Sequence, residues 1–265
     1  MLPKINLVKC QSADYLLFDT NDAITQHLKR NGSWETHLVA ISRLFTHGIQ
    51  SPVVLDVGAN LGAYAIPLAK ELAASGGLIY AFEPQRIVYY QLCGNIFLNR
   101  LDNVFAFWMA IGHEDGSITL PGIDYQKTQN VGGFSLVEQI RNQTDCVALT
   151  QTIEPVKTPL RRLSSVGLPD IVSLMKIDVE GYDLNVLSGA TDVIEHSHFP
   201  PLLFEAWGFD WFKERKEELF AFIKSMGYII TPIFGDDYVA QHPQHPVHID
   251  FVTDGQGRFK MTRTR

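Results

Sequence analysis

Acidic residues stand at the ends of short apolar segments throughout this chain. Such segments end at or just before Asp56, Glu83, Asp178, Glu180 and Glu205. Carboxylates in this position can accept hydrogen bonds from a ribose, bind a cationic ligand or remove a proton from an alcohol. They can also serve only as helix caps and strand ends. The residues around each carboxylate decide between these roles.

The run Asp56-Val-Gly-Ala-Asn-Leu-Gly62 has the spacing of a strand-to-helix turn. Gly58 and Gly62 allow such a turn, and the following helix offers free backbone N–H groups. The dinucleotide fingerprint GxGxxG requires its middle glycine at position 60, where this chain has Asn60. That glycine lets the backbone approach a pyrophosphate, and Asp56 adds a negative charge nearby. The loop therefore favours a cationic ligand without phosphate, such as S-adenosylmethionine.

Glu83 extends this interpretation to a nucleoside. It lies in Phe82-Glu83-Pro84, twenty-one residues after Gly62, where an acidic side chain accepts hydrogen bonds from both ribose hydroxyls. A ribose contact is common to NAD and S-adenosylmethionine, so it favours the latter only together with Asn60. Two alternatives remain open at this point: an NAD-dependent oxidoreductase, and a module that binds S-adenosylmethionine without turnover.

Strand and helix patterns alternate around these residues. Residues 52–57, 78–82, 104–109, 171–177 and 202–204 are predicted strands, and residues 63–74, 86–99, 184–194 and 211–226 are predicted helices. This alternation predicts an α/β fold with one open, mostly parallel sheet covered by helices on both faces. Residues 228–233 and 247–252 are expected to pair as a final antiparallel hairpin, and the Gly-rich stretch 112–158 to hold short strands and loops.

The domain organisation follows from these elements. We expect an N-terminal helical extension over 1–50, a catalytic domain over 51–257 and a basic tail over 258–265. The helical prediction for the extension depends on Ile41, Leu44, Phe45 and Ile49, which recur on one helix face.

Three motifs together resemble the FkbM-type S-adenosylmethionine-dependent methyltransferases over roughly residues 30–205. They are DVGANLG, FEP with Glu83 and Pro84, and Lys176-Ile-Asp-Val-Glu-Gly181 followed by Leu187-Ser-Gly-Ala190. The last motif is the most specific of the three. The resemblance implies a Rossmann-like sheet of seven strands with an antiparallel last strand, and a preference for methyl transfer to oxygen.

The resemblance also implies further cofactor-binding residues. Gly32-Ser-Trp-Glu35 is similar to the small-aromatic-Glu segment of the family, which adds Glu35, and the region after the third strand places Met109 and Ala110 at the adenine. One departure is clear. The family usually has Thr-Leu-Asp-Asp-Leu where this chain has Thr158-Pro-Leu-Arg-Arg-Leu163, so any role of that acidic pair is lost or moved.

Methyl transfer to an alcohol requires removal of the acceptor proton. Asp178, Glu180 and Glu205 are the predicted catalytic carboxylates at the cofactor edge, and His113 is the nearest imidazole by strand order. Alternatively, Asp178 and Glu205 could hold a divalent cation that lowers the pKa of the acceptor, although a metal is not predicted.

Two further segments carry ambiguous signals. The stretch Asn130-Val-Gly-Gly-Phe134 can form a loop of the active site, but Gly pairs more often form simple turns. In His242-Pro-Gln-His245-Pro-Val-His248, three imidazoles could hold a transition metal, yet a solvated His-Pro loop is the favoured interpretation.

Composition limits the partners of this protein. The chain has 265 residues, 46% of them hydrophobic, and a formal charge of -7, which disfavours nucleic acid as substrate. Its three cysteines have no CxxC spacing, and no apolar run is long enough to span a membrane. We therefore expect a cytoplasmic enzyme that acts on a small-molecule acceptor, such as a sugar or secondary metabolite, without membrane partners and with homodimerisation open.

Overall fold

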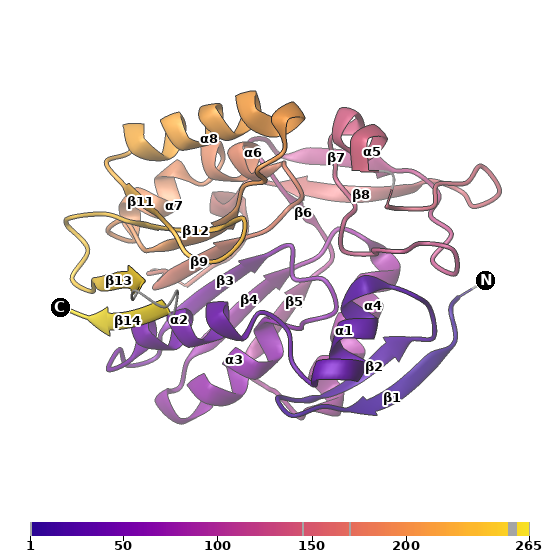
Figure 1. Ribbon diagram of the computed structural model, residues 1–265, viewed down its shortest axis with the longest axis horizontal. Helices are drawn as coiled ribbons and strands as arrows, with labels where there is room; N and C mark the ends of the chain where they lie inside the picture. Colours follow the sequence, from indigo (N-terminus) through magenta and orange to yellow (C-terminus); the bar gives the residue numbers. More distant parts are fainter. Residues whose placement is uncertain (1, 145, 170, 254–258, 265) are drawn as a thin grey trace.

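A twisted sheet of seven strands forms the centre of the computed structural model, which describes residues 2–144, 146–169, 171–253 and 259–264 (Figure 1). Its strands are β3 (Val53–Val57), β4 (Leu78–Phe82), β5 (Val104–Phe107), β9 (Leu174–Ile177), β10 (Leu202–Glu205), β11 (Ile229–Pro232) and β12 (Asp237–Gln241), in the spatial order β11-β12-β10-β9-β3-β4-β5. The strand β12 runs antiparallel to its neighbours β10 and β11, whereas β3, β4, β5, β9 and β10 are parallel. The predicted α/β class and the antiparallel last strand of the sheet are confirmed.

The sheet is covered on both faces because its central strands are apolar on both sides. In β3 all five residues are buried, with Val54 in one core and Leu55 and Val57 in the other. The helices α2 (Thr36–Thr46), α3 (Ala65–Leu72) and α4 (Arg86–Leu98) pack on the first face, and α6 (Asp183–Ser188), α7 (Thr191–His196) and α8 (Lys213–Ser225) on the second.

The direction of strand addition reverses between β3 and β9. From β3 the chain adds β4 and β5 on one side, and it then returns to place β9 on the other side of β3. Ligands of such sheets bind in the crevice at the carboxyl ends of the strands on either side of this switch point. Asp56, Asp178, Glu83 and Glu205 lie at that edge.

The N-terminal extension is only partly helical. The helices α1 (Ala23–Asn31) and α2 agree with the prediction, but residues before them form the antiparallel hairpin β1 (Ile5–Lys9) and β2 (Asp14–Phe18). Tyr15 and Leu17 point into the core while Ile5 and Leu7 are exposed. The alternation over so few residues gives a weak strand signal, and packing of β2 against α4 stabilises it.

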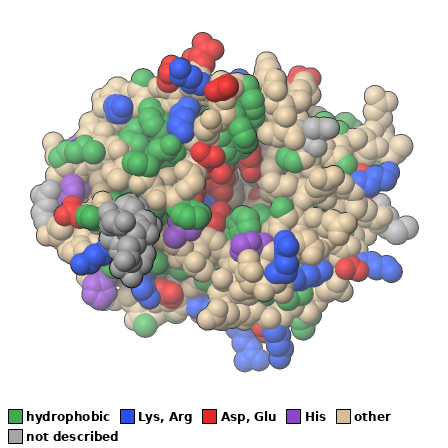
Figure 2. All heavy atoms as spheres, viewed as in Figure 1, with side chains coloured by type: hydrophobic (Ala, Val, Ile, Leu, Met, Phe, Trp, Pro, Cys, Tyr) green, Lys and Arg blue, Asp and Glu red, His purple; other side chains and the backbone are tan. Residues whose placement is uncertain are grey.

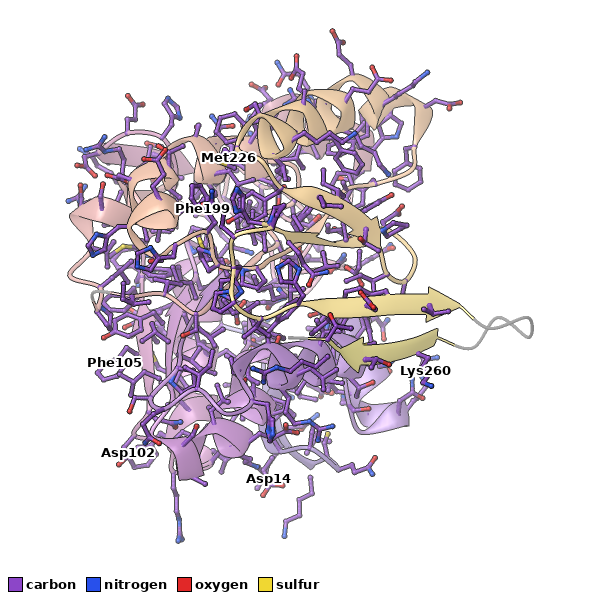
Figure 3. The ribbon with its side chains drawn as sticks, turned by 90° about the vertical axis from the view of Figure 1, so that its left-hand side faces the viewer. Asp14, Asp102, Phe105, Phe199, Met226 and Lys260 are labelled. Atoms are coloured by element: carbon purple, nitrogen blue, oxygen red, sulfur yellow. The ribbon has the colours of Figure 1, made fainter. Side chains whose placement is uncertain are left out.

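The predicted pairing of residues 228–233 with residues 247–252 is wrong. β11 pairs with β12, and β13 (Ile249–Thr253) pairs instead with β14 (Phe259–Arg263), which includes Lys260 (Figure 3). This second hairpin packs against α2, so most of the predicted basic tail is a strand. The predicted boundary between 257 and 258 lies outside the described residues.

The middle region contains short elements, as predicted. The strands β6 (Ala110–Ile111), β7 (Gly116–Leu120) and β8 (Val156–Arg161) form a small sheet, and α5 (Glu138–Thr144) is a helix of seven residues. Short 3-10 helices occupy Ala73–Ser75, Leu163–Ser165 and Asp210–Phe212. The predicted helix over 184–194 is split into α6 and α7 near Gly189, where an added Cβ would lie 2.0 Å from the Gly112 carbonyl oxygen. Across the described ranges, no helix is long and apolar enough to cross a bilayer.

Candidate active site

A cavity of about 290 Å³ opens at the switch point of the sheet. Figure 2 shows the hollow with acidic side chains on its floor and apolar side chains on its rim. Ten predicted site residues line it: Glu35, Gly58, Asn60, Glu83, Pro84, Met109, Ala110, Asp178, Glu180 and Glu205. The structure therefore brings ten of the twelve predicted cofactor-binding and catalytic residues together in one cavity.

The backbone N–H groups of residues 58–62, here called the glycine loop, already donate hydrogen bonds to partners within the protein. The N–H groups of Gly58 and Ala59 both donate to the Phe82 carbonyl oxygen, and that of Gly62 donates to Ala59. The N–H of Asn60 donates to the Glu83 carboxylate at 3.0 Å, and that of Leu61 to the Asn60 side chain at 2.8 Å. A loop whose donors are all committed offers no cradle for a phosphate.

Gly58 shows why this loop needs glycine. Its φ is +88°, and an added Cβ would lie 1.8 Å from the Asp178 carbonyl oxygen. The loop after β3 thus passes directly against the end of β9. Asn60 also has a left-handed backbone, with φ of +48°, as Asn residues tolerate.

Glu83 is fixed in orientation before any ligand binds. One of its carboxylate oxygens accepts the N–H of Asn60, and the other accepts the N–H of Gln85 at 2.8 Å. The side chain is only 4% exposed, and burial raises its pKa to about 8 despite these two hydrogen bonds. Each oxygen keeps a second acceptor position for a ligand hydroxyl.

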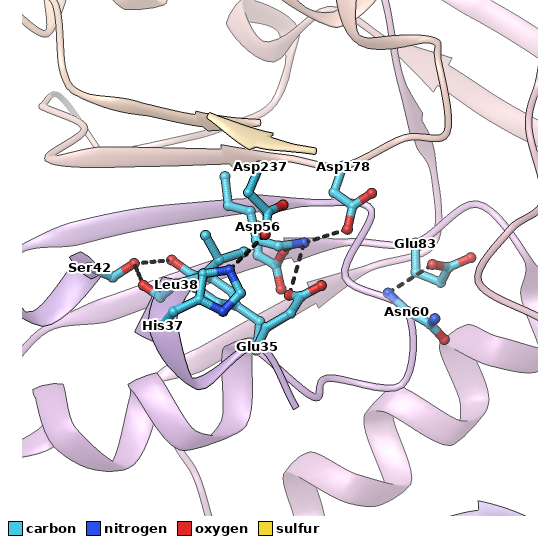
Figure 4. A network of polar contacts seen from close by, with 11 residues as sticks. Glu35, His37, Leu38, Ser42, Asp56, Asn60, Glu83, Asp178 and Asp237 are labelled. Carbon is cyan, nitrogen blue, oxygen red and sulfur yellow. Dashed lines mark hydrogen bonds and ion pairs between the residues drawn. The ribbon is translucent and has the colours of Figure 1, made fainter. Parts of the chain in front are cut away.

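Lys176 forms the centre of a buried ion-pair network with Glu35, Asp56 and Asp178, which are labelled in Figure 4. Its Nζ lies 3.0 Å from Asp178 Oδ2, 3.6 Å from Asp56 Oδ1 and 3.9 Å from Glu35 Oε2. Burial opposes the charge on Lys176, but the three carboxylates outweigh it and hold the pKa of Lys176 well above its ordinary value. Burial likewise raises the pKa of Asp56 to about 6 and of Glu35 to about 7, although Lys176 lowers both.

Asp178, Glu180 and Glu205, here called the carboxylate cluster, face one another across the cavity. Each offers an oxygen within 4.8 Å of the others. Burial raises the pKa of Glu205 to about 9, with a further increase from Asp178, and raises the pKa of Glu180 well above its ordinary value. Trp207 Nε1 donates to Glu205 Oε2 at 2.7 Å and orients that carboxylate. Glu180 has a left-handed φ of +54°, a conformation that costs backbone energy and recurs at functional sites.

The Methyltransferase FkbM domain family matches residues 56–230 of this chain, which include the glycine loop, Glu83 and the carboxylate cluster. The chain belongs to this family.

Two curated relatives of this FkbM-family chain are also methyltransferases by name. Methyltransferase 1 of Beauveria bassiana is 29% identical over 151 residues, which are 52% of this chain and 58% of that protein. Methyltransferase sdnD of Sordaria araneosa is 29% identical over 165 residues, covering 54% and 61%. The chain spans about three fifths of the length of each of these two relatives. A crystal structure of methyltransferase FkbM from Methylobacillus flagellatus is 21% identical and covers 75% of this chain and 47% of that chain, with a TM-score of 0.45.

Two of the predicted site residues of this FkbM domain do not line the cavity. Asp56 is fully buried behind Lys176, in register with it on the neighbouring strand, so its carboxylate holds the lysine instead of facing the cavity. Gly62 serves the turn: its φ is +91°, and an added Cβ would lie 2.8 Å from Ile66 and Leu92 side chains. His113 is exposed, bonds Asn185 and does not line the cavity either.

The segment 130–134 does reach the cavity. Asn130, Gly132 and Phe134 line it, and an added Cβ at Gly132 would lie 2.5 Å from Asn60 Nδ2. Asn130 Oδ1 is buried without a hydrogen-bond partner among the described residues, so it can accept from a ligand. Gln85 supports this segment by donating to the Val131 carbonyl oxygen at 3.0 Å.

The interpretation of the three C-terminal histidines as a solvated loop is wrong. His242 and His245 are 7% and 6% exposed, and His242 stacks on Phe199 with ring centroids 4.1 Å apart. Burial lowers the pKa of both imidazoles. Among the described residues, the carboxylate cluster, and not these histidines, groups ligand atoms closely enough for a metal ion.

Proposed function

We propose that this chain is an S-adenosylmethionine-dependent methyltransferase that methylates a hydroxyl group of a small-molecule acceptor. The observation that carries the proposal is one cavity that joins the oriented Glu83 carboxylate to the carboxylate cluster. Membership of the FkbM family supports the same reaction class.

The lining residues fit this cofactor. Glu83 keeps acceptor positions for the two ribose hydroxyls, and Asn130 Oδ1 is a buried acceptor that needs a donor. Met109 and Ala110 provide an apolar surface for the adenine. When bound, S-adenosylmethionine supplies an electrophilic methyl group on a positively charged sulfur.

Removal of the acceptor proton is the task of residues in this chain. Glu205 and Glu180 bind a proton more strongly than ordinary carboxylates, because burial and mutual repulsion disfavour their charged forms. A positive ligand charge nearby shifts them toward ionisation, which leaves a strong base beside the cavity. That base can take the proton of an acceptor hydroxyl as the new oxygen–carbon bond forms.

The loop disfavours the NAD-dependent alternative. A dinucleotide needs free backbone N–H groups and a close approach to its pyrophosphate, but the N–H groups of 58–62 are committed and Asn60 stands at the decisive position. The carboxylate cluster counts against a binding module without turnover, since buried carboxylates that repel one another destabilise a fold and persist where function needs them.

Calorimetric titration and a turnover assay test the proposal. The chain should bind S-adenosylmethionine and S-adenosylhomocysteine, and NAD much more weakly or not at all. With a panel of sugars, glycosides and phenols, mass spectrometry should detect one added methyl group and the release of S-adenosylhomocysteine. Tighter binding of NAD than of S-adenosylhomocysteine would overturn the cofactor assignment, and methylation of nitrogen or carbon would overturn the acceptor class.

A further inference from the structure

Lys176 is the one cationic side chain among the described residues that line the cavity. The other charged lining residues are acidic: Glu35, Glu83, Asp178, Glu180 and Glu205. A ligand that carries both charges can therefore place its cationic groups at many positions, but its anionic group at few. The amino-acid end of S-adenosylmethionine carries an ammonium and a carboxylate, so the position of the carboxylate is the more restricted of the two.

The ammonium of Lys176 has donor capacity to spare. It donates a hydrogen bond to Asp178 at 3.0 Å, whereas Asp56 and Glu35 lie 3.6 Å and 3.9 Å away, which are ion-pair distances and not short hydrogen bonds. An ammonium has three N–H donors. The group is also 5.4 Å from the centre of the Tyr64 ring, a contact that uses no N–H.

The glycine loop itself supplies no free backbone donor for an anion. Anionic groups commonly bind to free N–H groups where a strand turns into a helix. In the glycine loop, those of residues 58–62 all donate to partners inside the protein. Among the described lining residues, Lys176 is therefore the cationic side chain available to an anion.

We infer that Lys176 Nζ binds the α-carboxylate of the amino-acid end of S-adenosylmethionine, an inference that rests on the proposed function. Glu35 and Asp178 flank Nζ and also line the cavity, so they are acceptors for the neighbouring α-ammonium. The pairing places each charge of the ligand against its opposite within one small region.

In this assignment Asp56 does not contact the ligand directly. Asp56 and Lys176 are partners in the register of β3 and β9, and their side chains meet on one face of the sheet. Asp56 is fully buried, so it reaches the ligand only through Lys176. It is a positioning residue, which keeps the buried ammonium charged and fixed.

The experiment compares two ligands on the unmodified chain. Decarboxylated S-adenosylmethionine keeps the sulfonium, the ammonium and the nucleoside but lacks the carboxylate. By calorimetry, wild-type protein should bind S-adenosylmethionine roughly 10-fold or more tightly than the decarboxylated form, the scale of one charge-assisted hydrogen bond. In Lys176→Met this preference should fall below about 3-fold, because S-adenosylmethionine loses its partner and the analogue has none to lose. Lys213→Met, at an exposed lysine, should retain the full preference.

A double variant guards against loss of folding. Lys176→Met leaves buried carboxylates without their cation, so Lys176→Met with Asp56→Asn removes one charge of each sign. Circular dichroism checks the fold of both variants, and the double variant should lose the preference as the single one does. Equal binding of both ligands by wild type, or an unchanged preference in a folded variant, would refute the role of Lys176 while leaving the proposed function intact. No binding of S-adenosylmethionine by wild type would refute the proposed function itself.

Discussion

The two ends of the cavity differ in how their polar groups are satisfied. Near Glu83 the backbone N–H groups and the carboxylate oxygens are already hydrogen bonded, whereas near Glu205 three carboxylates lie close together. Glu83 accepts two backbone N–H groups, and the glycine loop beside it satisfies its own donors. Among the described residues, Glu205 accepts one hydrogen bond, from the Trp207 indole, and faces Asp178 and Glu180. The first region suits a ligand that must be held in one orientation, and the second suits a step in which protons change place.

The largest expected effect comes from the carboxylate cluster. Glu205→Gln and Asp178→Asn should each lower turnover roughly 100-fold or more, which is the scale of losing a general base. In Glu205→Gln cofactor affinity should change far less, because Glu205 lies away from the Glu83 side of the cavity, whereas Asp178→Asn should also weaken cofactor binding because Asp178 holds Lys176. Initial rates at saturating cofactor and calorimetric dissociation constants measure the two effects. Glu217→Gln, at an exposed position, is the control.

Two outcomes would change this interpretation. If both variants turn over like the parent with its acceptor, the base lies elsewhere and the loop region 112–158 is the place to search. If a chelator abolishes turnover and Mg²⁺ or Mn²⁺ restores it, the cluster holds a divalent cation that lowers the pKa of the acceptor.

A smaller loss, of cofactor affinity, is expected from Glu83. Glu83→Ala removes a charge-assisted bidentate contact, so cofactor binding should weaken by about 2–3 kcal/mol, roughly 30- to 150-fold. Calorimetry with S-adenosylhomocysteine measures this change, with Glu195→Ala at an exposed position as the control. An unchanged dissociation constant would show that Glu83 supports the glycine loop and does not contact the ligand.

The pH dependence of the free energy of unfolding tests the carboxylate cluster without any ligand. Burial raises the pKa of Glu205 from 4.5 to about 9, so between about pH 5 and pH 9 the folded chain holds a proton that the unfolded chain releases. The free energy of unfolding therefore falls as pH rises through this window, and Glu83, with a pKa of about 8, acts in the same direction.

Glu205→Gln should flatten this dependence by at most about 1.4 kcal/mol per pH unit, the value for one proton. Urea unfolding at pH 5, 7 and 9 measures the slope, and Glu217→Gln should leave it unchanged. A steeper decline in Glu205→Gln would contradict the assignment of the bound proton.

The sequence predicts the parallel core well because its signals are local. The buried runs of β3, β4 and β10 and the glycine turn each act within a few residues. The partner of β11 was predicted wrongly because strand pairing is a long-range choice, and 247–252 is as apolar as the true partner 237–241.

The role of Lys176 was missed for a related reason. Its motif was recognised, but nothing in a linear sequence shows that it faces Asp56 and Glu35. One signal was available: Asp56 and Lys176 are single charged residues inside two otherwise apolar strands. Two such residues of opposite charge in neighbouring buried strands are expected to pair, because an isolated buried charge is costly.

The smallest expected effect lies outside the cavity, at the C-terminal histidines. His242 packs its ring on Phe199 and meets Tyr228 edge-on, so His242→Ala should lower the free energy of unfolding by about 1–2 kcal/mol. His248→Gln, at a less buried position, should have a smaller effect. Replacing all three histidines by Gln should leave metal content and cofactor affinity unchanged while stability falls. Urea unfolding and elemental analysis of the purified variants measure these quantities, and loss of a stoichiometric metal from the triple variant would show that the histidines are ligands after all.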